Sequence, residues 1–228
     1  MNNLVLIKYS VDSRTIDRFI RRYSRIFNII IVDNSPDSEI LYNDTNIIKG
    51  KNHFREFSGM SEALNCIDTK EISKVFFCND TVLMNRCTWK LDHLSRKLKH
   101  VNVIHPTIFG FLDKSFEFFS DLWFLRNGCH IRTDVFALNS NGIDLFKEIM
   151  VCDFDSMFAD DSEFNEVVDD FMDRHHKSKL GQRKEIATFI ELYISTVFHK
   201  KGFIYDARDS GFKLRQSFDR LTHRILKK

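Results

Sequence analysis

The sequence is poor in the residues that mark fibrous, disordered or disulfide-bonded proteins. Of its 228 residues only two are proline and eight are glycine, which excludes collagen-like and Gly- or Pro-rich chains. The five cysteines are odd in number and form no C-x-x-C pair, so we expect reduced thiols and no structural zinc site. No apolar run reaches the roughly 18–20 residues of a membrane span, and strand-like LVLIKY leaves no room for a signal peptide after Met1. These absences predict a cytoplasmic protein.

Charge of either sign is not in excess. Lys and Arg total 34 against 32 Asp and Glu, for a net charge of +2, which excludes a generally basic nucleic-acid binder. Abundant instead are the 23 phenylalanines, which predict an aromatic interior. The length favours a single domain over residues 1–211, with halves at 1–100 and 101–211, followed by a short tail at 212–228.

Strand-like and helix-like segments alternate along the chain. An apolar run at 4–9, an amphipathic stretch at 12–27 and a second apolar run at 28–34 form a strand–helix–strand unit. Further strands are predicted at 46–50, 74–80, 101–110 and 202–207, irregular sheet at 122–138, and helices at 58–67, 88–99, 143–150 and 183–200. The fold class predicted is α/β, Rossmann-like, with a mixed, mostly parallel sheet flanked by helices.

Two predicted strands end in an acid. IIIVD ends at Asp33 and VFFCND ends at Asp80. In open α/β sheets the ligand crevice lies at the carboxyl ends of the strands, so we expect both carboxylates at one crevice. Either acid alone is equally well explained by an Asp-Asn turn.

The segments around these acids resemble the GT-A-fold glycosyltransferases, especially family 2 and the related rhamnan-synthesis-type transferases of bacteria. IIIVDNSPDS is similar to the first nucleotide-binding segment of that family, and Asn52…Gly59…Ala63…Asn65 is similar to its Asn-x-Gly-x-x-x-Ala-x-Asn helix, with a longer gap before the glycine. VFFCNDT resembles the strand that carries the DxD motif, with Asp80 as the last acid and Cys78 in place of the first. The resemblance covers residues 3–85 well and the remainder loosely.

The resemblance implies a GT-A-like fold and a UDP- or dTDP-linked sugar donor. Asp33 would accept a hydrogen bond from the base, and Asp80 would hold Mn²⁺ or Mg²⁺ and the diphosphate. The remaining nucleotide-binding residues implied are Asn34, Ser35, Asn52, Asn65 and Asn79. A thiol is a poor ligand for these hard cations, so Cys78 leaves the metal dependence open, and Cys78 is equally a small buried residue.

Glu191 is the candidate general base. Family 2 relatives carry an acid at the start of a helix, about eleven residues before a glycine, and here Gly202 follows Glu191 at that distance. An inverting transferase needs such a base for the acceptor hydroxyl, and the apolar neighbours of Glu191 should raise its pKa. A surface glutamate on an amphipathic helix is the alternative, and a retaining enzyme would need no base.

Four further residues are candidates for contact with the acceptor or the diphosphate. His130 and Arg132 alternate with Ile131, which places both on one face of a strand. Arg132 could hold an anion with its planar fork or pair with Asp134. Asp121 and Trp123 could line a sugar pocket, although Trp123 is equally an ordinary core residue.

The tail at 212–228 predicts a basic amphipathic helix, with Leu214, Phe218, Leu221 and Ile225 on one face. It fits either an anionic membrane surface at the inner face of the cell membrane or the side of the domain. The family implies inverting transfer to a glycan or lipid-linked glycan in bacterial surface polysaccharide synthesis. The alternatives are a non-catalytic nucleotide-binding or adaptor protein with a degenerate DxD site, or a nucleotidyltransferase, although KYSVDSR lacks the Gly-rich loop of the latter.

Overall fold

Seven strands form one mixed sheet in the computed structural model of the chain. The structure describes residues 2–35, 46–68, 73–85, 87–113, 130–154, 182–209 and 212. The strands are β1 (Asn2–Lys8), β2 (Phe27–Asp33), β3 (Asn46–Lys49), β4 (Lys74–Asn79), β5 (Thr107–Asp113), β6 (His130–Asn139) and β7 (Phe203–Asp206). Their order across the sheet is β3-β2-β1-β4-β6-β5-β7. Only β6 runs antiparallel to its neighbours, so the predicted mixed, mostly parallel α/β sheet is confirmed.

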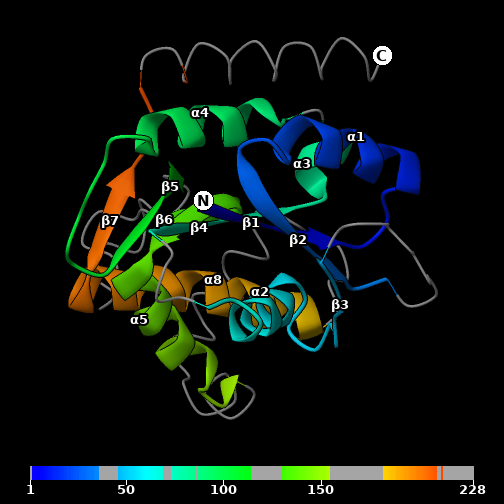
Figure 1. Cartoon of the computed structure of the whole chain (residues 1–228). Helices are drawn as coiled ribbons and strands as arrows, with labels where there is room; N and C mark the ends of the chain where they lie inside the picture. The colour runs from blue at the N-terminus through cyan, green and yellow to red at the C-terminus, as the bar shows by residue number, and fades with distance from the viewer. Residues whose placement is uncertain are drawn as a thin grey trace, which may run out of the picture.

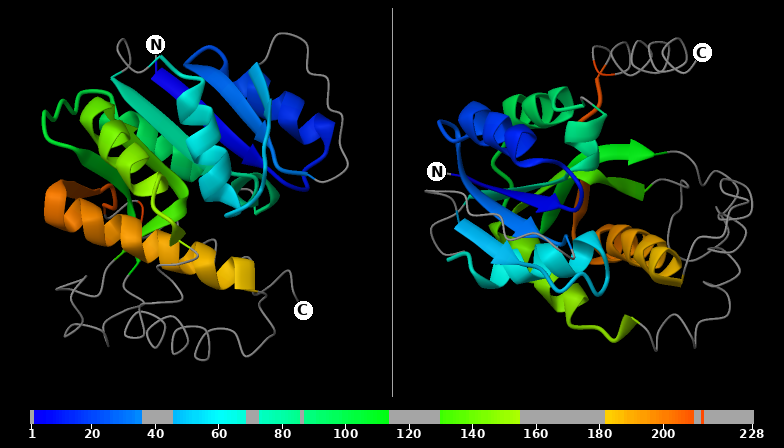
Figure 2. Two further views of the ribbon diagram at one scale, coloured as in Figure 1. Left: turned by 90° about the horizontal axis from the view of Figure 1, so that it is seen from below. Right: turned by 90° about the vertical axis from the view of Figure 1, so that its right-hand side faces the viewer.

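Helices cover both faces of this sheet (Figures 1 and 2). On one face lie α1 (Ser13–Tyr23), the single turn α3 (Thr81–Met84) and α4 (Trp89–Leu98), and on the other lie α2 (Glu56–Asn65), α5 (Ser140–Met150) and α8 (Gln182–Lys201). Each face has its own apolar cluster, and strand residues alternate between the two clusters. Among the described residues, nine of the ten largest fully buried side chains are phenylalanines, as the composition predicted.

Two predicted helices differ from the structure at one end, and one short helix was missed. Helix α1 stops at Tyr23 rather than Phe27, because the chain already turns at Ser24 to enter β2. Helix α5 begins three residues earlier than predicted, since the Asn139 side chain caps it by accepting from the N–H of Gly142 at 2.8 Å. Helix α3 was not predicted.

Strand β5 begins at Thr107, six residues after the predicted start at residue 101. Pro106 has no N–H to donate to a ladder, which opposes a strand through this position. The Asn139 amide also donates to the carbonyls of Val103 and His105, at 2.8 and 2.7 Å, and so holds this segment outside the sheet. The predicted strand across 101–106 is therefore wrong.

Strand β6 contains an irregularity that matters for the site. Ile131 of β6 pairs with Leu112 of β5, and Phe136 pairs with Gly110. Between these two pairs, β6 therefore covers five positions and β5 only two. Both Asp134 and Val135 consequently lie on the α4 side, whereas Ile131 and Phe136 lie in the cluster beneath α8.

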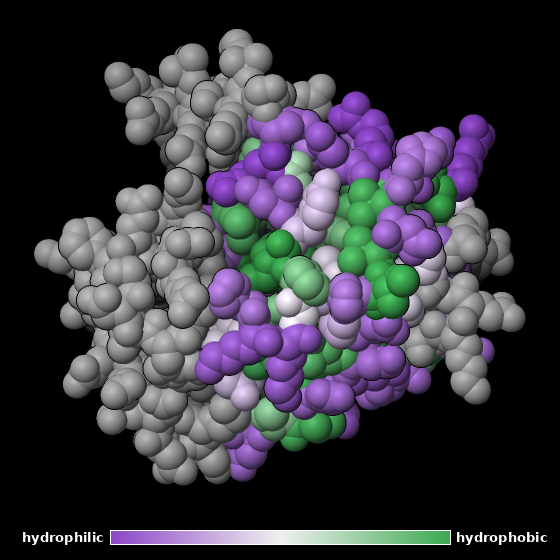
Figure 3. All heavy atoms as spheres, turned by 90° about the vertical axis from the view of Figure 1, so that its left-hand side faces the viewer, coloured by the Kyte–Doolittle hydropathy of each residue, from purple (hydrophilic) through white to green (hydrophobic). Residues whose placement is uncertain are grey.

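The edge strand β7 forms part of an exposed face on which hydrophobic side chains gather, ringed by hydrophilic ones (Figure 3). Phe203 and Tyr205 on this strand are 55% and 37% exposed. Within the part of the chain that the structure describes, none of the helices has the length and apolar character needed to cross a bilayer. The predicted tail helix lies outside the described residues, apart from Phe212, which stacks on Phe111 at 4.4 Å.

Candidate functional site

Asp33 and Asp80 lie at the same edge of the sheet. Strands β2, β1 and β4 are adjacent and parallel, so their carboxyl ends meet there. Asp33 pairs with Lys8 across β2 and β1, and Asn79, which precedes Asp80, pairs with Ile7. One strand, β1, therefore separates the two acids.

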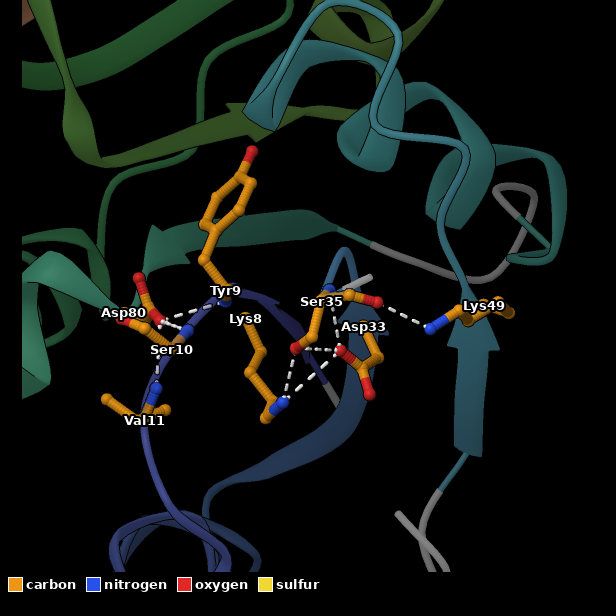
Figure 4. Close-up of polar contacts among 8 residues, drawn as sticks. All are labelled: Lys8, Tyr9, Ser10, Val11, Asp33, Ser35, Lys49 and Asp80. Carbon is orange, nitrogen blue, oxygen red and sulfur yellow. Dashed lines mark hydrogen bonds and ion pairs between the residues drawn. The ribbon is translucent and has the colours of Figure 1, made fainter. Parts of the chain in front are cut away.

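Asp33 belongs to a closed polar cluster (Figure 4). Lys8 Nζ donates to Asp33 Oδ1 at 3.2 Å and to Ser35 Oγ at 2.6 Å. The same Oδ1 accepts from the N–H of Ser35 at 2.9 Å and from its hydroxyl, while Lys49 Nζ donates to the Ser35 carbonyl at 2.6 Å. Lys8 and Asp33 are only 2% and 3% exposed. Protein donors thus already occupy the Oδ1 atom of Asp33.

Asp80 is held by backbone instead. Its Oδ2 atom accepts from the N–H groups of Tyr9 and Ser10, both at 2.8 Å, and of Val11 at 3.3 Å (Figure 4). Three successive N–H groups that converge on one oxygen form a concave anion site. Asp80 therefore fixes the turn between β1 and α1 and is itself 1% exposed.

A pocket of about 330 Å³ opens beside Asp80. It is lined from the ends of β1 and β4, the start of α2, the turn α3 and one side of α8, by Tyr9, Ser10, Arg55, Glu56, Asn79, Asp80, Thr81, Met84, Ala187 and Glu191. The sequence-predicted residues Asn79, Asp80 and Glu191 are thus brought together, although Glu191 lies more than a hundred positions along the chain. Asp33 is not among the described residues that line this pocket.

Glu191 carries the chemistry that a general base requires. Burial raises the pKa of Glu191 to about 7, although the N–H and hydroxyl of Thr133, each donating to Oε1 at 3.0 Å, favour the charged form. Nearby Asp134 raises this pKa further, and Arg132 lowers it. A carboxyl group with a pKa near neutrality can both take and return a proton, which suits general base catalysis.

The two charged pocket residues that the sequence did not predict are Arg55 and Glu56. The helix was predicted to start at Ser58, which left both in a loop; α2 instead starts at Glu56. Burial raises the pKa of Glu56, Arg55 lowers it, and the carboxyl groups of Glu191 and Asp80 raise it. The sequence did contain a signal for Glu56, because acids are favoured in the first turn of a helix and Glu56 lies beside the predicted helix start.

Arg55 has a backbone conformation that few non-glycine residues adopt. Its φ and ψ angles are 52° and −130°, a strain of about 1–3 kcal/mol. The Arg55 carbonyl accepts from Asn34 Nδ2 at 3.2 Å and from Ser58 Oγ at 3.0 Å. These two bonds hold the strained residue in place.

The predicted asparagines lie in different places. Asn34 is buried; it also donates to Tyr9 Oη at 3.1 Å, and a Cβ atom at Gly50 would lie 1.7 Å from its Oδ1 atom. Asn52, partly buried at a φ of 53°, follows β3 at the same edge. Asn65 is the exposed last residue of the ten-residue α2, roughly 14 Å along the helix from Glu56, so it is not brought to the pocket.

His130 and Arg132 lie among charged groups on the α4 side of β6. Arg132 reaches Asp134 at 3.4 Å and Asp113 at 3.7 Å, and Lys90 of α4 also pairs with Asp134. These contacts agree with the second alternative for Arg132, an ion pair with Asp134. Burial lowers the pKa of His130 to about 4. Thr133, which bonds Glu191, faces α8 on the other side, and the predicted residues Asp121 and Trp123 lie outside the described residues.

The described residues do not fit a metal ion held by protein ligands alone. Cys78 is fully buried in the apolar cluster beneath α1 and α4, where burial raises the pKa of its thiol. One Asp80 oxygen is already bonded to three N–H groups. Among residues that the structure describes, no three His, Cys, Asp or Glu side chains are placed to share a metal ion.

The comparisons with protein families and with curated proteins identify no relative of this chain. No protein-family model matches the chain, and no curated protein matches it.

Proposed function

We propose that this protein is a GT-A-like glycosyltransferase that moves a sugar from a UDP- or dTDP-linked donor to a hydroxyl group of a glycan or lipid-linked glycan, with inversion. The observation that carries the proposal is that Asp80 and Glu191 line one pocket at the carboxyl edge of the sheet. Ligands of open α/β sheets bind at this edge. Bacterial surface polysaccharide synthesis is the process that the resemblance implies.

In this proposal the base and ribose of the donor lie over β2 and β3, near Asp33, Asn34, Ser35 and Asn52, and the diphosphate lies beside Asp80. Asn79 fits this arrangement, because its buried Oδ1 atom has no hydrogen-bond partner among the described residues and can accept from a ligand. The sugar would then occupy the pocket.

Glu191 would act as the general base. Its carboxylate takes the proton of the acceptor hydroxyl while that oxygen attacks the anomeric carbon, and the bond between this carbon and the diphosphate oxygen breaks. The pKa of about 7 supports this role near neutral pH. Positioning of the two reactants provides much of the remaining rate enhancement.

The cellular location is also a proposal. We infer a cytoplasmic protein that can lie on the inner face of the cell membrane through residues 212–228. The six Lys and Arg residues of that segment against one Asp support attraction to anionic lipids.

Nucleotide binding tests the proposed function. UDP should raise the melting temperature of the protein by linkage, measured with EDTA and with Mn²⁺ so that the expected cation dependence is tested at once. With Mn²⁺ present, Asp80→Asn should reduce the shift. Asp92→Asn should not, because the Asp92 carboxylate accepts from Tyr23 Oη at 2.8 Å and does not line the pocket. No shift with UDP or dTDP would contradict the proposal, and an unchanged shift for Asp80→Asn would remove Asp80 from the site.

One observation favours a non-catalytic nucleotide-binding or adaptor protein as the second candidate. Asp80 has a complete structural explanation in the turn that it fixes. Slow hydrolysis of a UDP-sugar that is abolished by Glu191→Gln would favour the enzyme, and binding without hydrolysis or transfer would favour the adaptor.

A further inference from the structure

We propose that Arg55 binds the diphosphate of the donor, and that its strained backbone is maintained in order to direct the guanidinium group into the pocket. This inference rests on the proposed function, because it names the residue that meets the charge of the leaving group. Neither the motifs of the sequence nor the resemblance assigns a role to Arg55.

The first support is the strain itself. Arg55 combines a φ of 52° with a ψ of −130°, where glycine would fit without strain. A strained residue persists only when its surroundings over-determine it, and such residues cluster at functional sites. Asn34 and Ser58 supply this restraint through their bonds to the Arg55 carbonyl, at 3.2 and 3.0 Å.

The second support is the charge of the pocket. Arg55 is the one Lys or Arg among the described residues that line it, opposite three acids, Glu56, Asp80 and Glu191. Its nearest ion pair within the described chain is a loose one, from Nε to Glu56 Oε2 at 3.8 Å. The side chain is 42% exposed, so its guanidinium can reach a ligand that enters from solvent.

The third support is the matching chemistry. A guanidinium group presents several N–H donors in a planar fork that matches two phosphate oxygens. Arg55 also directly precedes α2, so the positive end of that helix points to the same region. When the bond to the anomeric carbon breaks, negative charge grows on the diphosphate, and Arg55 would stabilise that charge.

Glycine at position 55 separates a structural role from a binding role. Arg55→Gly removes the guanidinium group and relieves the backbone strain, so the unliganded protein should melt at the same or a higher temperature than the wild type. Arg55→Lys keeps the charge without the fork. Arg21→Ala removes an exposed arginine of the last turn of α1 that does not line the pocket, and it is the matched control.

The experiment is isothermal titration with UDP and with inorganic pyrophosphate, each in EDTA and in Mn²⁺. We expect Arg55→Gly to weaken binding of both about 10- to 100-fold, Arg55→Lys to weaken it less, and Arg21→Ala to leave it unchanged. UDP bound equally well by the wild type and Arg55→Gly would overturn the role of Arg55 and leave the proposed function intact. A clearly lower melting temperature for Arg55→Gly would also overturn it, by showing that the side chain supports the fold.

Two further outcomes concern both proposals. A wild type that binds neither UDP nor pyrophosphate would overturn both. Pyrophosphate binding that is weakened by Arg55→Gly, together with no gain in affinity from the uridine part of UDP, would support Arg55 and contradict the nucleotide-sugar donor.

Discussion

The two acidic strand ends at one edge of the sheet have opposite environments. Around Asp33, Lys8 of β1 pairs with the carboxylate and Ser35, just after β2, donates to it within a buried cluster. Around Asp80, backbone N–H groups hold one oxygen, and a pocket with two further carboxyl groups and a strained arginine opens beside it. Similar strand endings in the sequence therefore give one region whose polar groups bond one another in a buried cluster and another that lines an open pocket.

Asn34 connects these regions. It follows Asp33 directly, yet its amide donates to Tyr9 and Arg55, which both line the pocket. Changes on the Asp33 side should thus alter stability first, whereas changes on the Asp80 side should alter binding and turnover first.

The largest effect is expected for turnover. Glu191→Gln should lower the rate of sugar transfer or donor hydrolysis about 10²- to 10⁴-fold, because the amide cannot accept the hydroxyl proton. UDP affinity should stay the same. Glu148→Gln, an exposed acid on α5, is the control. Loss of UDP binding, or unchanged turnover, would show that Glu191 is structural.

A large effect on stability is expected on the Asp33 side. Lys8→Ala removes the buried ammonium group that pairs with the Asp33 carboxylate and should lower the free energy of unfolding by about 3–5 kcal/mol, measured by urea denaturation. The double variant Lys8→Met with Asp33→Leu, in which both residues are apolar, should lose much less of the free energy of unfolding. A loss below about 1 kcal/mol for Lys8→Ala would mean that this cluster is not what separates the two regions.

The raised pKa of Glu191 should make stability depend on pH. The folded protein keeps this proton up to a pH of about 7, whereas the unfolded chain releases it near 4.5, so the stabilisation is complete below pH 4.5 and is lost as the pH rises to 7. The loss is at most about 3 kcal/mol. Glu191→Gln should lack this part of the pH profile in urea denaturation at pH 4.5, 6 and 7.5, and parallel profiles would contradict the raised pKa.

The smallest effect concerns the link between the regions. Tyr9→Phe removes one acceptor of the Asn34 amide but leaves the Arg55 carbonyl, so the free energy of unfolding should fall by about 1 kcal/mol. Tyr205→Phe on the exposed edge strand should change it by less. A loss of several kcal/mol for Tyr9→Phe would place the pocket wall among the main determinants of the fold.

The sequence was sufficient for the sheet and for the position of the acidic strand ends. Apolar runs at β1, β2 and β4 are each buried from both sides, so hydrophobicity alone marked them, and parallel neighbours bring Asp33 and Asp80 to one edge. That Asp80 and Glu191 line one pocket was anticipated only through the family resemblance.

Side-chain partners could not be predicted, because they depend on register and on local backbone. That Lys8 faces Asp33 follows from the exact pairing of β1 with β2. Arg55 was missed because a strained residue that precedes a helix leaves no propensity signal in the sequence, whereas Glu56 could have been found as an acid in the first helical turn. The expectations for Asp121, Trp123 and the tail concern residues that the structure does not describe.

Ile131 and Phe136 of β6 are an odd number of residues apart, yet both lie in the cluster beneath α8. Deletions of one residue at different points of this strand should therefore have different effects on the fold. A deletion between Ile131 and Phe136 would restore an even interval, so that ordinary alternation alone would keep both residues in the cluster beneath α8. A deletion after Phe136 would instead shift the phase of Ala137 and Leu138 and turn apolar side chains to the wrong layer. The strand should therefore tolerate the loss of one residue only between Ile131 and Phe136, the interval that contains Thr133, which bonds Glu191 of the pocket.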